Sequence, residues 1–321
     1  MSLSILLDRD TFEAGTSVTG SIVVTQQDPN GISGKEIRIG IRGEEQTRVI
    51  DKESKQAFDA VCVLHEYSES LPGNILQSRK LRTGSQTIPF QLPLEDGLPQ
   101  TITIPWTHIT YMILCWLEDD EGTKEEQTGV SVNILAKPMV CPYPSPYHME
   151  PFVHFVKKNR LQRGHFVITL SVKDTIMELG GQVGVSLVIR NRSPLLIRRV
   201  KIALKQHVHA TAVNHEREGE RLLTFYEFQE FRKTKRMRSK WLRGVKPEED
   251  FEEVLQELDA EEHQGTLRIP KFTTLSYHGQ LFGVSHSLHI IIQTDLEDPI
   301  EIPISPVTIL RKLPIEGQGT E

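Results

Sequence analysis

The sequence predicts an all-β protein, organised as two tandem immunoglobulin-like β-sandwich domains with one short amphipathic helix inserted in the second. Three observations support this prediction: most of the chain alternates apolar and polar residues, a segment of the first half recurs in the second, and only one segment has a helical period. The 321 residues suffice for two domains, and a hydrophobic content of 38% is too high for a disordered chain.

The recurring segment lies at residues 12–24 and again at 177–189. Its identical positions, 165 residues apart, are Glu13 and Glu178, Gly15 and Gly180, Val18 and Val183, Ser21 and Ser186, and Val23 and Val188. Each copy predicts a strand, a turn at the glycine and a second strand, because glycine adopts positive φ without a steric penalty. A tandem duplication explains the constant spacing.

A second pair of segments, 36–42 and 199–205, alternates in the same way. Ile37, Ile39 and Ile41 share one face of the first, as Val200, Ile202 and Leu204 do in the second. Further strands are predicted at 86–92, 110–117, 130–135, 166–172, 287–293 and 300–304.

The domain boundaries follow from composition. We predict an N-terminal sandwich at 1–136, a Pro-rich linker at 137–160, a C-terminal sandwich at 161–311 and a short tail at 312–321. Five prolines between 137 and 151 disfavour a helix or a central strand there. The single predicted helix spans 247–263, with apolar residues at helical spacing and acids on its other face.

Charge and cysteine content limit the function classes. A net charge of -6 disfavours nucleic acid as a partner. Three cysteines without a C-x-x-C pair predict neither a disulfide framework nor a zinc knuckle, and they favour a reducing compartment. The sequence has no apolar run long enough for a spanning helix, so a cytoplasmic location is expected.

Motifs for catalysis are not found, so we predict no enzyme activity and no cofactor. Phosphate loops, nucleophile elbows and H-E-x-x-H patterns are absent from the sequence. A remote alternative is a metal-dependent enzyme that uses His207 and His209, which alternation places on one strand face, with His215 as a third ligand. The competing interpretation is a pair of exposed histidines.

The densest positive charge lies at 232–243 and includes an aromatic side chain. Its candidate partner-binding or lipid-binding residues are Lys233, Lys235, Arg236, Arg238, Lys240, Trp241 and Arg243. Cations near an anionic membrane contribute about 1 kcal/mol each, so peripheral membrane contact is one interpretation. The other is pairing with the acidic helix that follows.

The linker contains a sequence similar to a PPxY ligand. Pro144, Pro146 and Tyr147 supply prolines and a tyrosine, but Ser145 stands where the second proline of that motif belongs. A docking motif for an aromatic groove and a stiff spacer are both compatible with this segment.

Several segments, taken in order, resemble the arrestin fold and are most similar to the arrestin-domain-containing (α-arrestin) family. They are the Phe12, Gly15, Val18, Gly20 spacing, the proline-flanked segments 88–93 and 97–99, 109–111, 178–180, 189–193, 267–270, 284–288 with His286 in place of tyrosine, and 300–304. The resemblance spans nearly the whole chain.

The resemblance implies a non-enzymatic cytosolic adaptor. Such a scaffold binds cytoplasmic tails of receptors or transporters and links them to endocytic trafficking or ubiquitin machinery, with recruitment to the plasma membrane or endosomes. This sequence lacks a PPxY tail and the cations by which visual arrestins sense phosphate. The alternative is an endosomal sorting coat subunit similar to the arrestin-like subunit of retromer.

Overall fold

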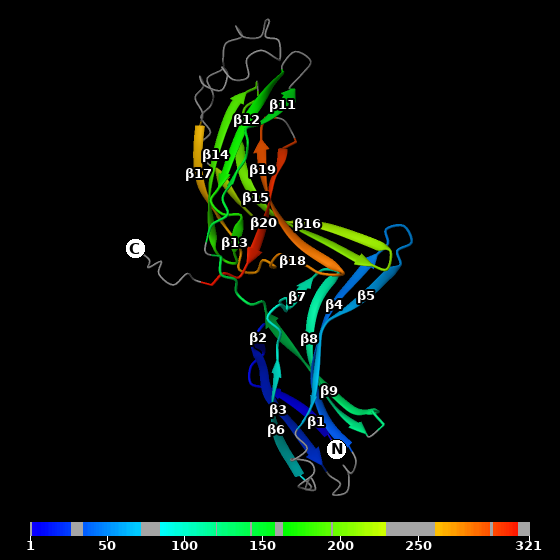
Figure 1. Ribbon diagram of the computed structural model, residues 1–321. Helices are drawn as coiled ribbons and strands as arrows, with labels where there is room; N and C mark the ends of the chain where they lie inside the picture. Colours follow the sequence, from blue (N-terminus) through cyan, green and yellow to red (C-terminus); the bar gives the residue numbers. More distant parts are fainter. Residues whose placement is uncertain are drawn as a thin grey trace, which may run out of the picture. The chain divides into compact units, whose positions relative to one another are not determined.

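The protein is an all-β chain in the part that the structure describes, which confirms this prediction. The computed structural model describes residues 2–26, 35–71, 84–119, 121–141, 143–157, 163–193, 195–228, 261–295 and 298–313. Within these ranges the strands form four sheets, and there is no helix (Figure 1). A search of the same residues finds no helix that could span a membrane.

The chain divides into two compact units. The first unit contains residues 1–138 together with two later segments, 208–218 and 277–283. The second unit contains residues 139–207, 219–276 and 284–321. Segments that are distant in sequence therefore complete the first unit.

Two of the sheets belong to the first part of the chain. The smaller one is formed, in order, by β1 (Ser2–Leu7), β3 (Ser17–Gln26) and β6 (Gly84–Pro93). The larger one is formed by β2 (Thr11–Glu13), β9 (Lys124–Leu135), β8 (Thr107–Asp119), β4 (Lys35–Ile50) and β5 (Ala57–Ser70), with β7 (Ile102–Ile104) paired to β8.

The other two sheets follow the same plan. One is formed by β10 (Tyr147–His148), β12 (Arg163–Val172), β14 (Gln182–Arg192) and β17 (Glu261–Arg268), with β11 (Phe152–Lys157) also on β12. The last is formed by β13 (Ile176–Glu178), β20 (Ile300–Leu310), β19 (Phe282–Gln293), β15 (Arg199–Ala212) and β16 (His215–Phe228), with β18 (Tyr277–His278) paired to β19.

Strand pairing repeats with the same register in the two halves. Thr11 pairs with Asn133 in a parallel ladder, and Ile176 pairs with Thr308 in the equivalent ladder. Both predicted turn glycines have positive φ, 81° at Gly15 and 78° at Gly180. The recurrence seen in sequence is thus accompanied by a recurrence of topology.

The core is built from the alternating apolar faces that the sequence predicts. Ile37, Ile39 and Ile41 of β4 are buried, as are Val200, Ile202 and Leu204 of β15. Alternate residues of a strand point to opposite faces, so each sheet buries one apolar face, an arrangement typical of β-sandwiches.

Two predictions about local structure need comment. The stretch predicted as linker, 137–160, contains the short strands β10 and β11, which pair with β12. The predicted helix lies mostly outside the described residues, but its last three positions, 261–263, are wrong: they begin strand β17 and pair with residues 187–189 of β14. Ladder pairing decides the conformation there, and an acidic composition is no obstacle at an exposed edge.

Candidate functional site

A buried carboxylate is the centre of the polar structure in the first unit. Glu45 of β4 has an exposed fraction of 0%, and its carboxylate accepts backbone N–H bonds from Gln280 at 3.0 Å, Leu281 at 3.1 Å and Phe282 at 2.9 Å. Buried charges need hydrogen-bond partners to offset lost hydration, and three donors supply them here. Glu45 therefore ties residues 280–282 to the middle of β4.

The surroundings of Glu45 are fitted closely to it. A Cβ atom at Gly279 would collide with the Glu45 carboxylate and the Tyr277 hydroxyl, so only glycine fits there. Burial and, next, the charge of Glu45 raise the pKa of Tyr277, which keeps its hydroxyl protonated as a donor. Thr47 donates its own hydroxyl to the Thr211 carbonyl at 2.6 Å, which holds a second late segment of the unit.

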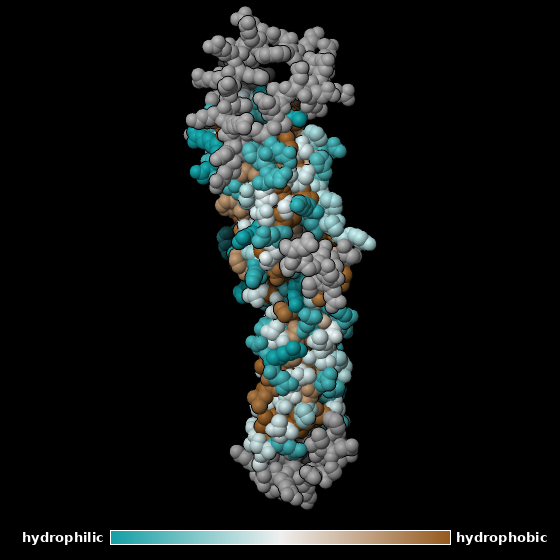
Figure 2. Space-filling model, turned by 90° about the vertical axis from the view of Figure 1, so that its left-hand side faces the viewer, coloured by the Kyte–Doolittle hydropathy of each residue, from teal (hydrophilic) through white to brown (hydrophobic). Residues whose placement is uncertain are grey.

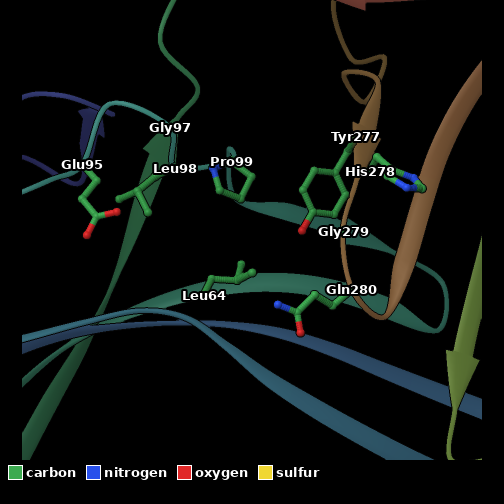
Figure 3. Close-up of a pocket in the computed structure, with 9 residues that line it drawn as sticks. All are labelled: Leu64, Glu95, Gly97, Leu98, Pro99, Tyr277, His278, Gly279 and Gln280. Atoms are coloured by element: carbon green, nitrogen blue, oxygen red, sulfur yellow. The ribbon is translucent and has the colours of Figure 1, made fainter.

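A recess of about 440 Å³ opens beside this segment of the first unit. Figure 3 shows Tyr277 and Gln280 on one side, Leu98 and Pro99 on the other, and Leu64 on the strand below. Carboxylate, amide and imidazole groups from Glu95, Gln280 and His278 stand at its rim. An apolar floor with a polar rim suits a peptide side chain.

Two reactive side chains lie close to this recess. The Cys62 thiol donates to Gln280 Oε1 at 3.0 Å, and Cys62 is one of three free cysteines. His65 is buried, and its Nδ1 lies 3.4 Å from Glu95 Oε1. Neither group has a second catalytic partner given by these contacts, so the recess is described as a binding surface.

A larger recess of about 910 Å³ lies in the second unit. It crosses the outward face of the β10-β12-β14-β17 sheet, where small side chains form its floor. The floor and walls include Ser171, Gly184, Ser186, Gln264, Thr266, Pro146, Tyr147, Lys173 and Tyr226.

The candidate docking motif of the linker lines this larger recess. Pro144 and Pro146 are exposed, whereas Tyr147 is half-buried and donates its hydroxyl to the Ile304 carbonyl at 3.2 Å. The backbone of Ser145 is held by Asp174 Oδ1 at 3.0 Å and by Thr175 N at 2.8 Å. The tyrosine of the motif thus packs against its own sheet.

The candidate metal ligands do not form one cluster. His207 Nε2 lies 2.6 Å from Ser287 Oγ, His209 Nε2 lies 3.6 Å from Glu216 Oε2, and the His215 ring stacks on Phe58 at 3.9 Å. Within the described ranges, no group of three His, Cys, Asp or Glu side chains is arranged to hold a metal ion.

His207 belongs instead to a polar network on the β15-β16-β19-β20 sheet. Ser287 lies between His207 and His289, with His289 Nε2 at 2.8 Å from its hydroxyl. Lys205 bridges Glu220 and Glu301, and His289 Nδ1 lies 2.7 Å from Glu301 Oε1. Burial and, next, the positive charge of Lys205 lower the pKa of His289, so this imidazole is predominantly neutral at pH 7.

The strongest electrostatic feature of the sequence lies outside the described residues. Its members are Lys233, Lys235, Arg236, Arg238, Lys240, Trp241 and Arg243. The structure therefore describes none of the residues predicted for lipid or partner binding at 232–243, and that assignment stays a prediction.

Sequence reasoning missed Glu45 although a signal was present. Along β4, Ile37, Ile39 and Ile41 face the core, and continuing this alternation places Glu45 on the same face. A carboxylate at a core position indicates a bound partner group. The identity of that group could not be read from sequence, because it lies more than 230 residues away.

Comparison with known proteins adds no relative. No protein-family model matches the chain, and no curated protein sequence matches it either.

Proposed function

We propose that this protein is a non-enzymatic cytosolic adaptor with an arrestin fold, made of two tandem immunoglobulin-like sandwiches. It binds cytoplasmic tails of membrane receptors or transporters and connects them to endocytic trafficking or ubiquitin machinery. The resemblance to α-arrestins in the sequence motivates this assignment, and function inferred from fold is an analogy that needs its own test.

The observation that carries the fold assignment is the repeated strand pairing. Ser2 pairs with Thr25 in the first half, and Val167 pairs with Arg190 in the second, both 165 residues further along. Tyr111 and His286 are related in the same way through their partners Val132 and Val307. Two copies of one module, placed in tandem, account for both correspondences.

Binding surfaces support the adaptor role. Each unit has a shallow recess with an apolar floor or walls and polar groups around it. Exposed large hydrophobic residues, such as Phe155 and Phe272, add contact area. A peptide tail presents side chains of this size and chemistry.

Proximity labelling of the full chain in its native cell tests the proposal. The expected result is enrichment of membrane receptors, transporters and sorting factors over the labelling enzyme alone. If the enriched set contains none of these classes, the adaptor proposal is wrong.

The alternative within the same class is an endosomal coat subunit similar to the arrestin-like subunit of retromer. Co-purification separates the two: a stoichiometric coat complex supports the alternative, whereas recovery of ubiquitin ligases with receptor tails supports the adaptor.

Membrane recruitment through the basic run at 232–243 is a separate prediction. Reversing the charges of Lys235, Arg236 and Arg238 should remove most binding to phosphatidylserine vesicles, because each cation contributes about 1 kcal/mol near an anionic surface. Liposome co-sedimentation measures this, with charge reversal at the exposed pair Lys52 and Lys55 as the matched control. Unchanged affinity after reversal at 235, 236 and 238 would contradict the prediction.

A further inference from the structure

The edge strands of the two equivalent sheets differ in their capacity to accept another strand. β6 ends the β1-β3-β6 sheet, and β17 ends the β10-β12-β14-β17 sheet. Ser21 pairs with Pro89, and the equivalent Ser186 pairs with Gln264. Gln264 in β17 therefore takes the place of Pro89 in β6.

The direction of each backbone N–H follows from one hydrogen bond at the end of each strand. Leu94 N donates to Thr16 O at 2.8 Å, so in β6 the even-numbered N–H groups point toward β3. Ile269 N donates to Gly181 O at 2.9 Å, so in β17 the odd-numbered N–H groups point toward β14. The remaining N–H groups of both strands point away from their sheets.

Prolines remove outward donors from β6 but not from β17. Pro89 and Pro93 occupy outward positions and have no N–H, which protects an edge against pairing. The outward positions of β17 are Glu262, Gln264, Thr266 and Arg268, and each retains its N–H. Among the residues that the structure describes, no strand pairs with this side of β17.

The chemistry beside β17 defines what would fit there. The Tyr226 ring packs directly against the β17 backbone, where a Cβ at Gly265 would collide with it. Phe228 stands against Tyr226 with ring centroids 5.1 Å apart, which extends the aromatic surface below the edge. On the outer face, Glu262 and Arg268 are exposed at opposite ends of the strand.

We propose that the free edge of β17 binds an extended peptide segment of a partner protein by strand addition. The peptide backbone pairs with the four outward N–H groups and the adjacent carbonyls, which only an extended chain matches in spacing. Its side chains on one face are apolar and contact Tyr226. On the other face a basic residue lies near Glu262 and an acidic residue near Arg268.

This inference rests on the proposed adaptor function and names the place where the tail binds. Figure 1 shows β17 at the margin of its sheet, and Figure 2 turns that side of the molecule toward the viewer. The described residues on this face are mainly hydrophilic or intermediate, with hydrophobic side chains scattered among them. Backbone pairing, which is independent of hydropathy, suits such a surface.

The test selects a phage-displayed library of random twelve-residue peptides against the full chain. Selected peptides are then measured by fluorescence anisotropy on three proteins: wild type, Gln264→Pro and Gln264→Ala. Both variants lose the side chain, but only the proline variant loses the outward N–H. We expect about tenfold weaker binding to Gln264→Pro, because one backbone donor is lost and the pairing interrupted, and less than about twofold change for Gln264→Ala.

Pro89 shows that a proline is tolerated at this position of an edge strand, and a circular dichroism spectrum identical to wild type verifies folding of the variant. Hydrogen exchange provides a measurement without mutation: the amides of Gln264 and Thr266 should exchange rapidly in the free chain and slowly with peptide bound. The inference is overturned if no peptide is selected, if the selected peptides bind Gln264→Pro as well as wild type, or if these amides are already protected in the free chain. A dimer that Gln264→Pro dissociates would also overturn it, since a second copy would then occupy the edge.

The result separates the inference from the proposed function. If proximity labelling recovers membrane proteins equally with wild type and Gln264→Pro, the adaptor proposal stands and the β17 assignment is wrong. If the peptides bind at β17 but no membrane proteins are recovered, the assignment stands and the adaptor proposal is wrong.

Discussion

Tyr111 in β8 and His286 in β19 occupy equivalent positions in the two halves, yet their polar groups are satisfied differently. The Tyr111 hydroxyl donates to the Pro99 carbonyl at 2.8 Å. His286 Nδ1 lies 3.0 Å from Ser276 Oγ, and its Nε2 is buried with no hydrogen-bond partner among the described residues. The same backbone frame thus holds a satisfied phenol in one half and a half-satisfied imidazole in the other, which makes the second half sensitive to acid.

The equivalent β4 and β15 strands show the opposite contrast. Continuing the spacing of 163 residues between them places Val208 where the first half has Glu45. Both are buried, but Val208 needs no hydrogen bonds, whereas Glu45 accepts three. Each half has therefore placed a buried polar group at a different point of one common framework.

The largest effect is expected from Glu45→Val, which gives the first half the residue of the second. Three buried N–H groups lose their acceptor, and each unsatisfied group costs about 1–3 kcal/mol, so the free energy of unfolding should fall by about 4 kcal/mol. Urea denaturation measures it. Glu66→Val, on the exposed side of β5, is the matched control and should change stability by less than about 0.5 kcal/mol. Equal effects of the two substitutions would contradict the structural role of Glu45.

A pH-dependent loss of stability is expected next, in the second unit. Burial, and then the charge of nearby His207, lowers the pKa of His286 from 6.5 to about 4. The unfolded chain therefore binds a proton that the folded chain excludes between these values, so stability is complete above pH 6.5 and is lost as pH falls toward 4. The loss attributable to His286 is about 3 kcal/mol.

Urea denaturation at pH 7, 6, 5 and 4 measures this loss, and His286→Tyr, which copies the residue of the first half, should reduce the pH dependence by that amount. His148→Tyr, at an exposed histidine of the same unit, should leave it unchanged. The assignment is wrong if the His286→Tyr variant and wild type lose stability equally on acidification.

The smallest effect is expected from Tyr111→Phe. The substitution removes one hydroxyl and leaves the Pro99 carbonyl without this donor, which should cost about 1 kcal/mol. Thermal unfolding at neutral pH measures it, and the value should not vary between pH 7 and 5, in contrast to that of His286→Tyr. A strong pH dependence would show that the two positions are not distinguished by titration.

Much of the fold could be predicted from sequence because it depends on local alternation. Residues 86–92, 110–117, 166–172 and 287–293 all lie within strands β6, β8, β12 and β19. The glycine turns at Gly15 and Gly180 were predicted for the same reason, since positive φ is a property of one residue. Strand β16 was missed because its polar sequence, HEREGERLLTFYEF, has no clear period.

The candidate sites were less predictable because they depend on contacts between distant segments. The donors to Glu45 come from 280–282, and only the folded topology places them beside β4. Residues 261–263 were assigned to a helix because acidic residues continue the polar face of 247–260, while pairing with β14 holds them as a strand. His207 and His209 share a strand as predicted, but each contacts a different neighbour.

The anchoring of Glu45 by residues 280–282 has a consequence for synthesis of the chain on the ribosome. The β4 carboxylate emerges more than 230 residues before the amides that receive it, so the early part of the polypeptide waits for most of translation before this acid is neutralised by donors. A fragment that stops at Pro138 lacks those amides altogether, and a nascent chain of that length is a natural client for chaperones.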